Sequence, residues 1–366
     1  MKNYIFCISL FLLGTTLAFA QQQEIVWDDT VLLDKPLRIA SHTRIIGKKG
    51  NLLKIARDGK PYKLTKGALI LDGVEDVTIE RVNFDLNASD NFATLVYLLN
   101  CKNVTIQNCT FINSNQQNAP EEWTLHGINA RDVDQLTVVG NYSNGCQFKL
   151  DGASYSATNL KVSDNFIENC TQMGISVVAT ARSRSVEIKN VEITNNVLRN
   201  IDDIGIYLGV DSGAGTYDST FIMENITIAG NRISELGYLL NSTPTRGIQI
   251  RGTKDTKCVR IFDNTIVDSV KTKFSRGMDI KNADDNTLMQ SIIVQQNRIH
   301  NMDHFGIIIR ASQHTDVVDN YCEGGKGILI DGCQSGAIVN NVTKNTRYHI
   351  LNESTDMNEV NNTVKE

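Results

Sequence analysis

The chain has 366 residues, with 36 Lys and Arg against 41 Asp and Glu, so its formal net charge is −5. Hydrophobic residues make up 41% and charged residues 21%, which is typical of globular proteins and excludes a disordered or collagen-like chain. The mild acidity gives no reason to expect a nucleic-acid partner, because phosphate binding needs clustered positive charge. Asparagine is over-represented with 37 residues, and most of them recur in a repeated pattern.

Residues 1–20 have the features of a secretory signal peptide. Lys2 precedes an apolar run over residues 5–13, and the small residues Ala18 and Ala20 fit a cleavage site before Gln21. No second apolar stretch approaches the ~18 residues that a membrane helix needs. We therefore expect an exported protein without a membrane span, located in the periplasm, at the cell surface or outside the cell.

The chain after this segment divides into two parts. Residues 21–66 are irregular but strand-like, and we expect them to form N-terminal capping strands. Residues 67–366 consist of repeats. We expect the mature chain to be one domain and to act as a monomer.

Each repeat contains alternating apolar residues, then an Asn, then a second short apolar pair. The Asn residues follow one another at intervals of 21 to 35 residues, and they are Asn83, Asn108, Asn141, Asn165, Asn196, Asn231, Asn264, Asn297, Asn320, Asn341 and Asn362. Alternation with a period of two predicts strands with one buried face, and each run is too short for a helix. A repeat of this length built only from strands indicates a β-helix.

A second strand pattern lies between the Asn units and begins with Gly followed by an apolar residue. It is clearest in residues 247–250, 277–280 and 306–309. The residue after the Gly and the residue two positions later are expected to point inward, and the residue between them outward. Successive coils stack about 4.8 Å apart, so outward residues at one position form a column.

These repeats resemble the right-handed parallel β-helix superfamily that contains the pectate lyases and polygalacturonases. The resemblance covers nearly the whole mature chain and implies an all-β, single-domain solenoid of about ten or eleven coils. It also implies that the repeated Asn form an internal ladder in tight turns, where an Asn can adopt the left-handed conformation. The seven cysteines after the signal peptide are expected to be small buried side chains, with a disulfide between neighbouring turns left open.

The outward columns of the second strand are the candidate functional surface. The middle column is expected to hold Asn129, Lys149, Ser176, Tyr207, Gln249, Asp279, Ile308 and Leu329. The next column is expected to hold Arg131, Asp151, Val178, Gly209, Arg251, Lys281, Arg310 and Asp331. The position before the Gly is assigned to His126, Asp203, Arg246, Arg276, Phe305 and Lys326.

Cations are concentrated in the later part of these columns. Arg251, Lys281 and Arg310 share one position on three consecutive coils, with Arg246 and Arg276 beside them. Stacked like charges repel by roughly 1 kcal/mol or more at partial exposure, so an anionic ligand explains the arrangement better than stability does. An acidic polysaccharide presents carboxylates in a line, and Arg binds carboxylates bidentately. A Lys among Arg side chains has a lowered pKa and is suited to act as a base.

This order of residues is similar to the lyases related to chondroitinase B and the alginate lyases of that family, in which a Lys ends one outward strand and an Arg ends the next. The resemblance implies β-elimination on a uronate polysaccharide, with Lys281 as the base and Arg310 as the acid or charge stabiliser. Arg251 completes the expected catalytic group. Asp279 either positions Lys281, binds a metal such as Ca²⁺ or is simply an ion-pair partner.

A rival constellation is the pair Asp202 and Asp203 before the strand at residues 204–208. Polygalacturonase-like hydrolases carry paired Asp at such a place, and two carboxylates are what glycoside hydrolysis needs. The pair also suits a polar turn or a Ca²⁺ site. Two further alternatives are a uronate epimerase, which shares the proton chemistry, and a non-catalytic glycan-binding protein.

The remaining candidates are expected to contact substrate. Arg246, Arg276, Lys149 and Gln249 belong to the outward columns. His126 and His304 lie beside the outward strands, and His304 is a reserve acid–base candidate. Tyr207 is a candidate for stacking on a sugar or for an acid, and Trp123 for an aromatic platform.

Overall fold

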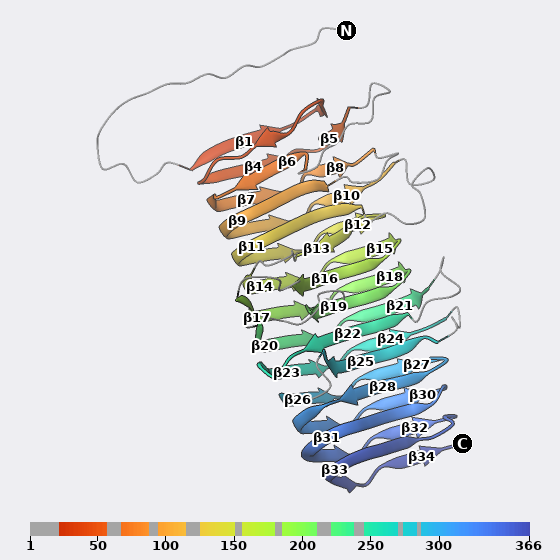
Figure 1. Ribbon diagram of the computed structural model, residues 1–366. Helices are drawn as coiled ribbons and strands as arrows, with labels where there is room; N and C mark the ends of the chain where they lie inside the picture. Colours follow the sequence, from red (N-terminus) through yellow and green to blue (C-terminus); the bar gives the residue numbers. More distant parts are fainter. Residues whose placement is uncertain are drawn as a thin grey trace.

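The computed structural model describes residues 22–56, 67–87, 94–114, 125–150, 156–179, 185–210, 221–237, 245–269, 274–283 and 287–366. The predicted signal peptide, Trp123 and Asp151 therefore lie outside the described residues. The strands stack in coils from one end of the molecule to the other, and the chain runs along this stack from N- to C-terminus (Figure 1). All the strand pairings are parallel, as expected of a β-helix, and three faces result.

The first face carries the predicted Gly-Ile strands. It consists of β3 (Leu37–Arg38), β6 (Leu69–Asp72), the N-terminal parts of β9 (Thr94–Gln107) and β11 (His126–Val139), β13 (Gln147–Lys149), β16 (Met173–Ala179), β19 (Ile204–Val210), β22 (Arg246–Gly252), β25 (Arg276–Asn282), β28 (Phe305–Arg310), and the N-terminal parts of β31 (Gly327–Val339) and β33 (Ile350–Val360).

The second face carries the alternating strands that precede the repeated Asn. It consists of β1 (Gln23–Trp27), β4 (Thr43–Gly47), β7 (Glu75–Glu80), β14 (Ala157–Ser163), β17 (Val186–Thr194), β20 (Phe221–Ala229), β23 (Thr256–Phe262), β26 (Met289–Gln295), β29 (Ser312–Val318), and the C-terminal parts of β9, β11, β31 and β33.

The third face is a separate sheet of 13 short strands that follow the repeated Asn. It consists of β2 (Thr30–Leu33), β5 (Leu52–Ile55), β8 (Asn83–Asp85), β10 (Thr110–Ile112), β12 (Tyr142–Asn144), β15 (Phe166–Cys170), β18 (Val197–Ile201), β21 (Arg232–Leu236), β24 (Thr265–Val267), β27 (Arg298–His300), β30 (Tyr321–Glu323), β32 (Val342–Lys344) and β34 (Thr363–Lys365). Thirteen exceeds the ten or eleven coils predicted, because residues 22–56 contribute strands that stack in the same parallel way.

Aliphatic side chains from all three faces fill the interior. Ile248, Ile250 and Ile280 are fully buried, which confirms the predicted inward positions of the Gly-Ile strands. The Gly itself is required by close approach of the next coil, since a Cβ on Gly247 would lie 2.8 Å from the carbonyl oxygen of Gly277. The seven cysteines are free, and all but Cys258 are buried, as expected. Within the described part of the chain, no helix has the length and hydropathy that a membrane crossing requires.

An internal Asn ladder runs from Asn141 to Asn362 at the turn between the second and third faces. Asn264 is typical: its Nδ2 donates to Asn297 Oδ1 at 3.0 Å, and its Oδ1 accepts from Asn231 Nδ2 at 2.9 Å. This confirms the predicted ladder. The left-handed conformation, however, belongs to the residue before each ladder Asn, such as Asp263 with φ 55°.

Two repeated Asn do not occupy the ladder position that the alignment predicted. Asn108 is the left-handed residue, with φ 53°, and Cys109 takes the ladder position and donates its backbone N–H to Asn141 Oδ1 at 2.9 Å. In each coil from Cys109 onward, the residue after the ladder position donates its backbone N–H to the carbonyl of the ladder residue one coil earlier. Thr110, which follows Cys109, donates in this way to Val82 O, so Val82 holds the ladder position and Asn83 lies one residue beyond it. The ladder therefore starts later than predicted, with Val82 and Cys109 at its position in the two preceding coils.

Candidate functional site

The cations predicted from the sequence lie side by side on the first face. Strand pairing places Arg251 opposite Lys281 and Lys281 opposite Arg310, on β22, β25 and β28. Arg246 lies opposite Arg276 at the other end of β22 and β25. We call these five side chains the cation belt. Parallel strands lie about 4.8 Å apart, so three cations at one position form a continuous positive row.

Where the structure describes them, the predicted columns are otherwise confirmed, with two exceptions. Tyr207, Gln249, Asp279 and Ile308 follow one another in register, as predicted. Arg246 lies opposite Ile204, however, and not opposite Asp203, which was assigned to that position. In the same way Phe305 pairs with Gly327 and not with Lys326. Asp203 and Lys326 each lie one residue before the strand, in the turn.

Asp279 is the anion that holds two belt arginines together. Its carboxylate is fully buried, and Oδ2 accepts from Arg246 Nε at 3.1 Å and from Arg276 Nη1 at 2.6 Å. Burial alone would raise the pKa of Asp279, but Arg276, Arg246 and Lys281 outweigh it and hold the pKa below its ordinary value. Its partners are thus the arginines and not Lys281. Asp279 Oδ1 is buried without a hydrogen-bond partner.

Lys281 has the features of a base. It is half-buried, and within the described residues it makes no ion pair or hydrogen bond. Burial lowers the pKa of its amine, and Arg251, Arg246 and Arg276 lower it further against the opposing effect of Asp279. A lysine with a lowered pKa has more of the neutral amine that can accept a proton.

The arginines around Lys281 retain unused hydrogen-bonding capacity. Arg310 Nε donates to Asp331 Oδ2 at 3.2 Å, and both side chains are more than a third exposed. Arg251 Nε and Arg276 Nε, in contrast, are buried without a partner. Buried donors without partners are costly, so their occurrence together in one belt indicates a site shaped for a ligand with acceptor atoms.

His304 lies in the turn before β28, next to the belt. Its ring packs edge-to-face on Phe305 with centroids 5.0 Å apart, and Nδ1 is buried without a partner. Burial, followed by Lys326 and Arg276, lowers the pKa of His304 to about 4. The imidazole is therefore neutral near pH 7, so of its two predicted reserve roles the neutral ring fits that of a base and not that of an acid.

Tyr207 and Gln249 lie on the first face in the same column as Asp279, next to the belt. Tyr207 packs against Val178 and Ile204, and its hydroxyl donates to Val210 O at 3.1 Å. The side chain is only 6% exposed, so its ring is a buried packing surface and not the open stacking platform expected. Gln249 is also buried, between Tyr207 and Asp279 in the register.

The rival carboxylates lie at the N-terminal edge of the belt. Asp202 is buried, and Asp203 Oδ1 lies 4.0 Å from Arg246 Nη1. Burial raises the pKa of Asp203, and Asp202 raises it further, although Arg246 lowers it. A carboxyl group with a raised pKa is a possible proton donor.

The predicted metal ligands do not come together as a group. Among the described residues, the three side chains whose ligand atoms lie within 4.8 Å of one another are His42, Glu75 and Asp76, near the N-terminal coils. The carboxylate of Asp279 already serves two arginines, so its surroundings are those of a structural anion and not of a Ca²⁺ ligand.

His126 and Lys149 belong to a different cluster, on β11 and β13. His126 Nδ1 lies 3.3 Å from Thr94 Oγ1, and its Nε2 is buried without a partner. Burial, with Lys149 and Arg131, lowers the pKa of His126 to about 3. Strands β16 and β19 separate this cluster from the belt, so the predicted substrate-binding residues fall into two groups.

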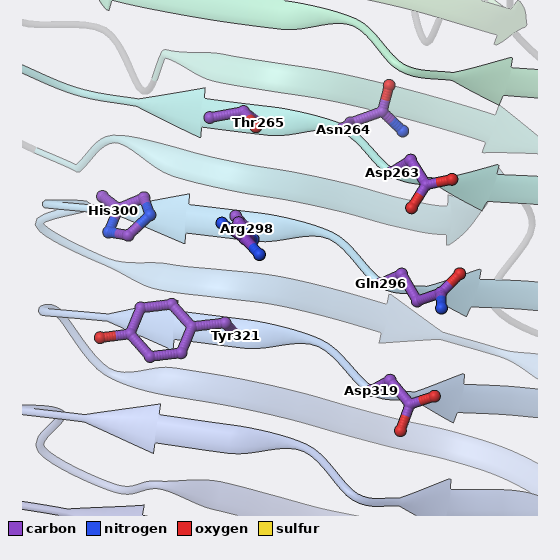
Figure 2. A pocket seen from close by; sticks show the side chains of 8 residues that line it. All are labelled: Asp263, Asn264, Thr265, Gln296, Arg298, His300, Asp319 and Tyr321. Atoms are coloured by element: carbon purple, nitrogen blue, oxygen red, sulfur yellow. The ribbon is translucent and has the colours of Figure 1, made fainter.

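A groove on the third face was not predicted. It has a volume of about 810 Å³ and is lined by Asp263, Asn264, Thr265, Gln296, Arg298, His300, Asp319 and Tyr321 (Figure 2). The signal in the sequence that could have indicated this groove is the polar residue that precedes each ladder Asn. The repeat pattern gave these residues a structural explanation, so they were not singled out.

Comparison with known proteins agrees with this architecture. The family model of the right-handed β-helix region matches residues 66–255, so the chain belongs to the right-handed β-helix family. Among curated proteins, none matches the sequence.

Solved structures of a surface adhesin show the same fold. Two structures of PfbA, a surface adhesin of Streptococcus pneumoniae, are similar with TM-scores of 0.57 and 0.58 at 16% identity, and cover 94% and 91% of this chain and 89% and 83% of theirs. The A-module of the mannuronan C-5 epimerase AlgE6 from Azotobacter vinelandii has a TM-score of 0.42 at 13% identity, with 93% of this chain and 84% of that chain covered. Likeness at this level of identity concerns the fold alone.

Proposed function

We propose that this protein is an exported enzyme that cleaves an acidic, uronate-containing polysaccharide by β-elimination. The observation that carries the proposal is the row of Arg251, Lys281 and Arg310 on three consecutive strands. A free lysine amine lies between two guanidinium groups in this row. A uronate offers a carboxylate for the arginines and an acidic C5 proton for the amine.

Each step of the reaction has a candidate group in the belt. Arg251, whose Nε has no protein partner, binds the uronate carboxylate and stabilises the negative charge that develops at C5. Lys281 Nζ takes the C5 proton. The electron pair of the C5–H bond forms the C4–C5 double bond, and the C4–O glycosidic bond breaks. The oxygen departs as an alkoxide whose negative charge Arg310 stabilises, and it then takes a proton from solvent water.

Asp279 has a positioning role in this mechanism. It fixes Arg246 and Arg276 through short hydrogen bonds, and these two arginines then face the same side as Lys281. Their combined charge lowers the pKa of Lys281 and attracts the anionic chain. No step requires a metal ion.

The test is ultraviolet absorbance during incubation with alginate, polygalacturonate, chondroitin sulfate, dermatan sulfate and hyaluronan. Rising absorbance reports the C4–C5 double bond of the product and would support the proposal. Flat absorbance with all five polymers would contradict lyase activity on these substrates. Parallel assays for new reducing ends and for proton exchange at C5 distinguish a hydrolase, an epimerase and a binding protein when the absorbance stays flat.

A glycoside hydrolase is the second candidate, and the raised pKa of Asp203 beside Asp202 favours it. This hypothesis predicts new reducing ends without absorbance, and loss of that activity in Asp203→Asn. Exchange at C5 without cleavage would indicate an epimerase. Binding without any of these reactions would leave a non-catalytic glycan-binding protein.

A further inference from the structure

We propose that the groove on the third face is a second binding site, and that it binds an uncharged oligosaccharide. The groove crosses three consecutive coils at β24, β27 and β30 (Figure 2). Its volume of about 810 Å³ lies within the range of small-molecule sites. It lies on a different face from the cation belt, and the inference does not depend on the proposed function.

Two columns of polar side chains line the groove. Asp263, Gln296 and Asp319 form the turn column, and each has a left-handed backbone with φ of 55° or 56°. Thr265, Arg298 and Tyr321 form the strand column and pair in register. Figure 2 shows the two columns side by side, with His300 beyond the strand column. The groove therefore repeats donors and acceptors once per coil, as a chain of sugar rings repeats its hydroxyl groups.

The polar groups of the groove are available to a ligand. Gln296, Arg298 and Asp319 are exposed, and within the described residues their side chains form no ion pair or hydrogen bond. The same is true of Asp263. Arg298 thus lies in a groove with two carboxylates and pairs with neither. Side chains that keep their hydrogen-bonding groups free can exchange water for sugar hydroxyls at little cost.

A pair of aromatic rings, His300 and Tyr321, lines part of the groove. The rings of His300 and Tyr321 lie 5.3 Å apart. Both are fixed by one carboxylate, since Glu323 Oε2 accepts from the Tyr321 hydroxyl at 3.1 Å and contacts His300 Nδ1 at 3.2 Å. Lys344 Nζ holds the other oxygen of Glu323 at 3.3 Å. A ring held in place loses little entropy on binding, and an aromatic face suits the apolar face of a sugar ring.

Charge selects the class of sugar. Among the residues that line the groove, the carboxylates of Asp263 and Asp319 outnumber the guanidinium of Arg298. Uronates and sulfated sugars are repelled by such a surface, whereas hydroxyl groups both donate to carboxylates and accept from Arg298. The cation belt has the opposite preference.

Isothermal titration calorimetry on the whole mature protein tests the proposal. The probes are cellohexaose, xylohexaose, mannohexaose and maltohexaose, with hexagalacturonate as the charged comparator. We expect at least one uncharged hexaose to bind, and the affinity to fall at least about tenfold in Arg298→Ala and in Tyr321→Ala. Tyr321→Phe, which keeps the ring, should retain more affinity than Tyr321→Ala and guards against a folding artefact.

The matched control is Arg232→Ala. Arg232 is an exposed residue of the same strand column, opposite Thr265 on the preceding coil, but it does not line the groove. Its substitution should leave hexaose binding unchanged, and so should Lys281→Ala in the cation belt. Absence of binding by all four uncharged hexaoses would overturn the proposal. So would binding that survives both Arg298→Ala and Tyr321→Ala.

Discussion

Lys281 and Arg310 occupy equivalent positions on neighbouring parallel strands, with Arg251 at the same position on the other side of Lys281. Side chains at equivalent positions of a parallel sheet point the same way, so three cations are held against one another by the fold. Arg310 is partly neutralised by Asp331, whereas Lys281 has no anionic partner within 4 Å in the described residues. The result is an amine whose pKa is lowered by burial and by its neighbours.

Lys281→Ala should remove turnover and leave the fold intact. A general base contributes about 10²–10⁴-fold to rate, so kcat should fall at least about 100-fold. Within the described residues the side chain makes no ion pair or hydrogen bond, so the Tm should change little. The measurement is product absorbance with the substrate found in the polymer screen, together with a thermal melt. A large fall in Tm together with the loss of activity would make Lys281 structural.

The pH dependence of the proposed activity in the wild-type protein provides a separate test of Lys281. Only the neutral amine accepts a proton, so kcat/KM should rise with pH until it passes the pKa of Lys281, which lies below its ordinary value. Arg251→Gln should move this limb of the profile to higher pH, because it removes a cation that lowers the pKa. A limb unmoved by Arg251→Gln would contradict the role of the belt in tuning the base.

Asp279→Asn should destabilise the protein strongly. The substitution keeps the shape of the side chain but removes the buried carboxylate that Arg246 and Arg276 share. Breaking a buried ion pair from one side costs about 3–5 kcal/mol, which urea denaturation can measure. Asp331→Asn is the matched control, because the Arg310–Asp331 pair is partly exposed and worth at most about 1 kcal/mol. Equal effects of the two substitutions would argue against Asp279 as the anchor of the belt.

The sequence predicted the fold and the row of cations because both depend on the regular period of the strands. Gly before each outward strand fixed the register, so Arg251, Lys281 and Arg310 could be aligned without coordinates. Two positions at the start of the strands were misplaced by one residue. Asp203 precedes Ile204, which is the residue before Gly205 and pairs with Arg246. Lys326 was misplaced because the pairing of β28 with β31 shifts by one residue between Phe305 and Ile307.

Other features depend on packing that the pattern does not show. Cys109, and not Asn108, stands at the ladder position. Asn occurs both at the ladder position and at the left-handed position before it, so an Asn in the sequence does not tell the two positions apart. Asp279 was assigned next to Lys281 along one strand, whereas its partners Arg246 and Arg276 reach it from two strands. The groove around Arg298 lies where the chain turns from the second face into the third face. The periodicity of the sequence does not predict the shape of this turn.

Asn340 and Asn341 should respond differently to substitution, although they are adjacent. Asn341 is buried, donates from Nδ2 to Val317 O at 2.7 Å and accepts from the backbone N–H of Asn320 at 3.0 Å. Asn341→Ala should therefore cost about 1–3 kcal/mol in the free energy of unfolding, because buried partners are left unsatisfied. Asn340 is exposed with φ 54°, so Asn340→Gly should be nearly neutral. A larger effect at Asn340 would contradict the ladder assignment.

His126 should make the protein sensitive to acid. Its pKa is about 3 in the folded protein against about 6.5 for an unperturbed histidine, so the unfolded chain binds the proton more readily between these values. Stability rises with pH wherever the unfolded state binds more protons, and the contribution of His126 is thus complete above about pH 6.5 and is lost as the pH falls toward 3. Each unit of pH in this window removes at most about 1.4 kcal/mol. The measurement is the free energy of unfolding between pH 4 and pH 7 for the wild type and for His126→Gln, which keeps a polar group beside Thr94 but does not titrate. The difference between the two proteins should change with pH in this window, with the variant losing less stability in acid. Parallel curves for the two proteins would show that His126 does not carry this dependence.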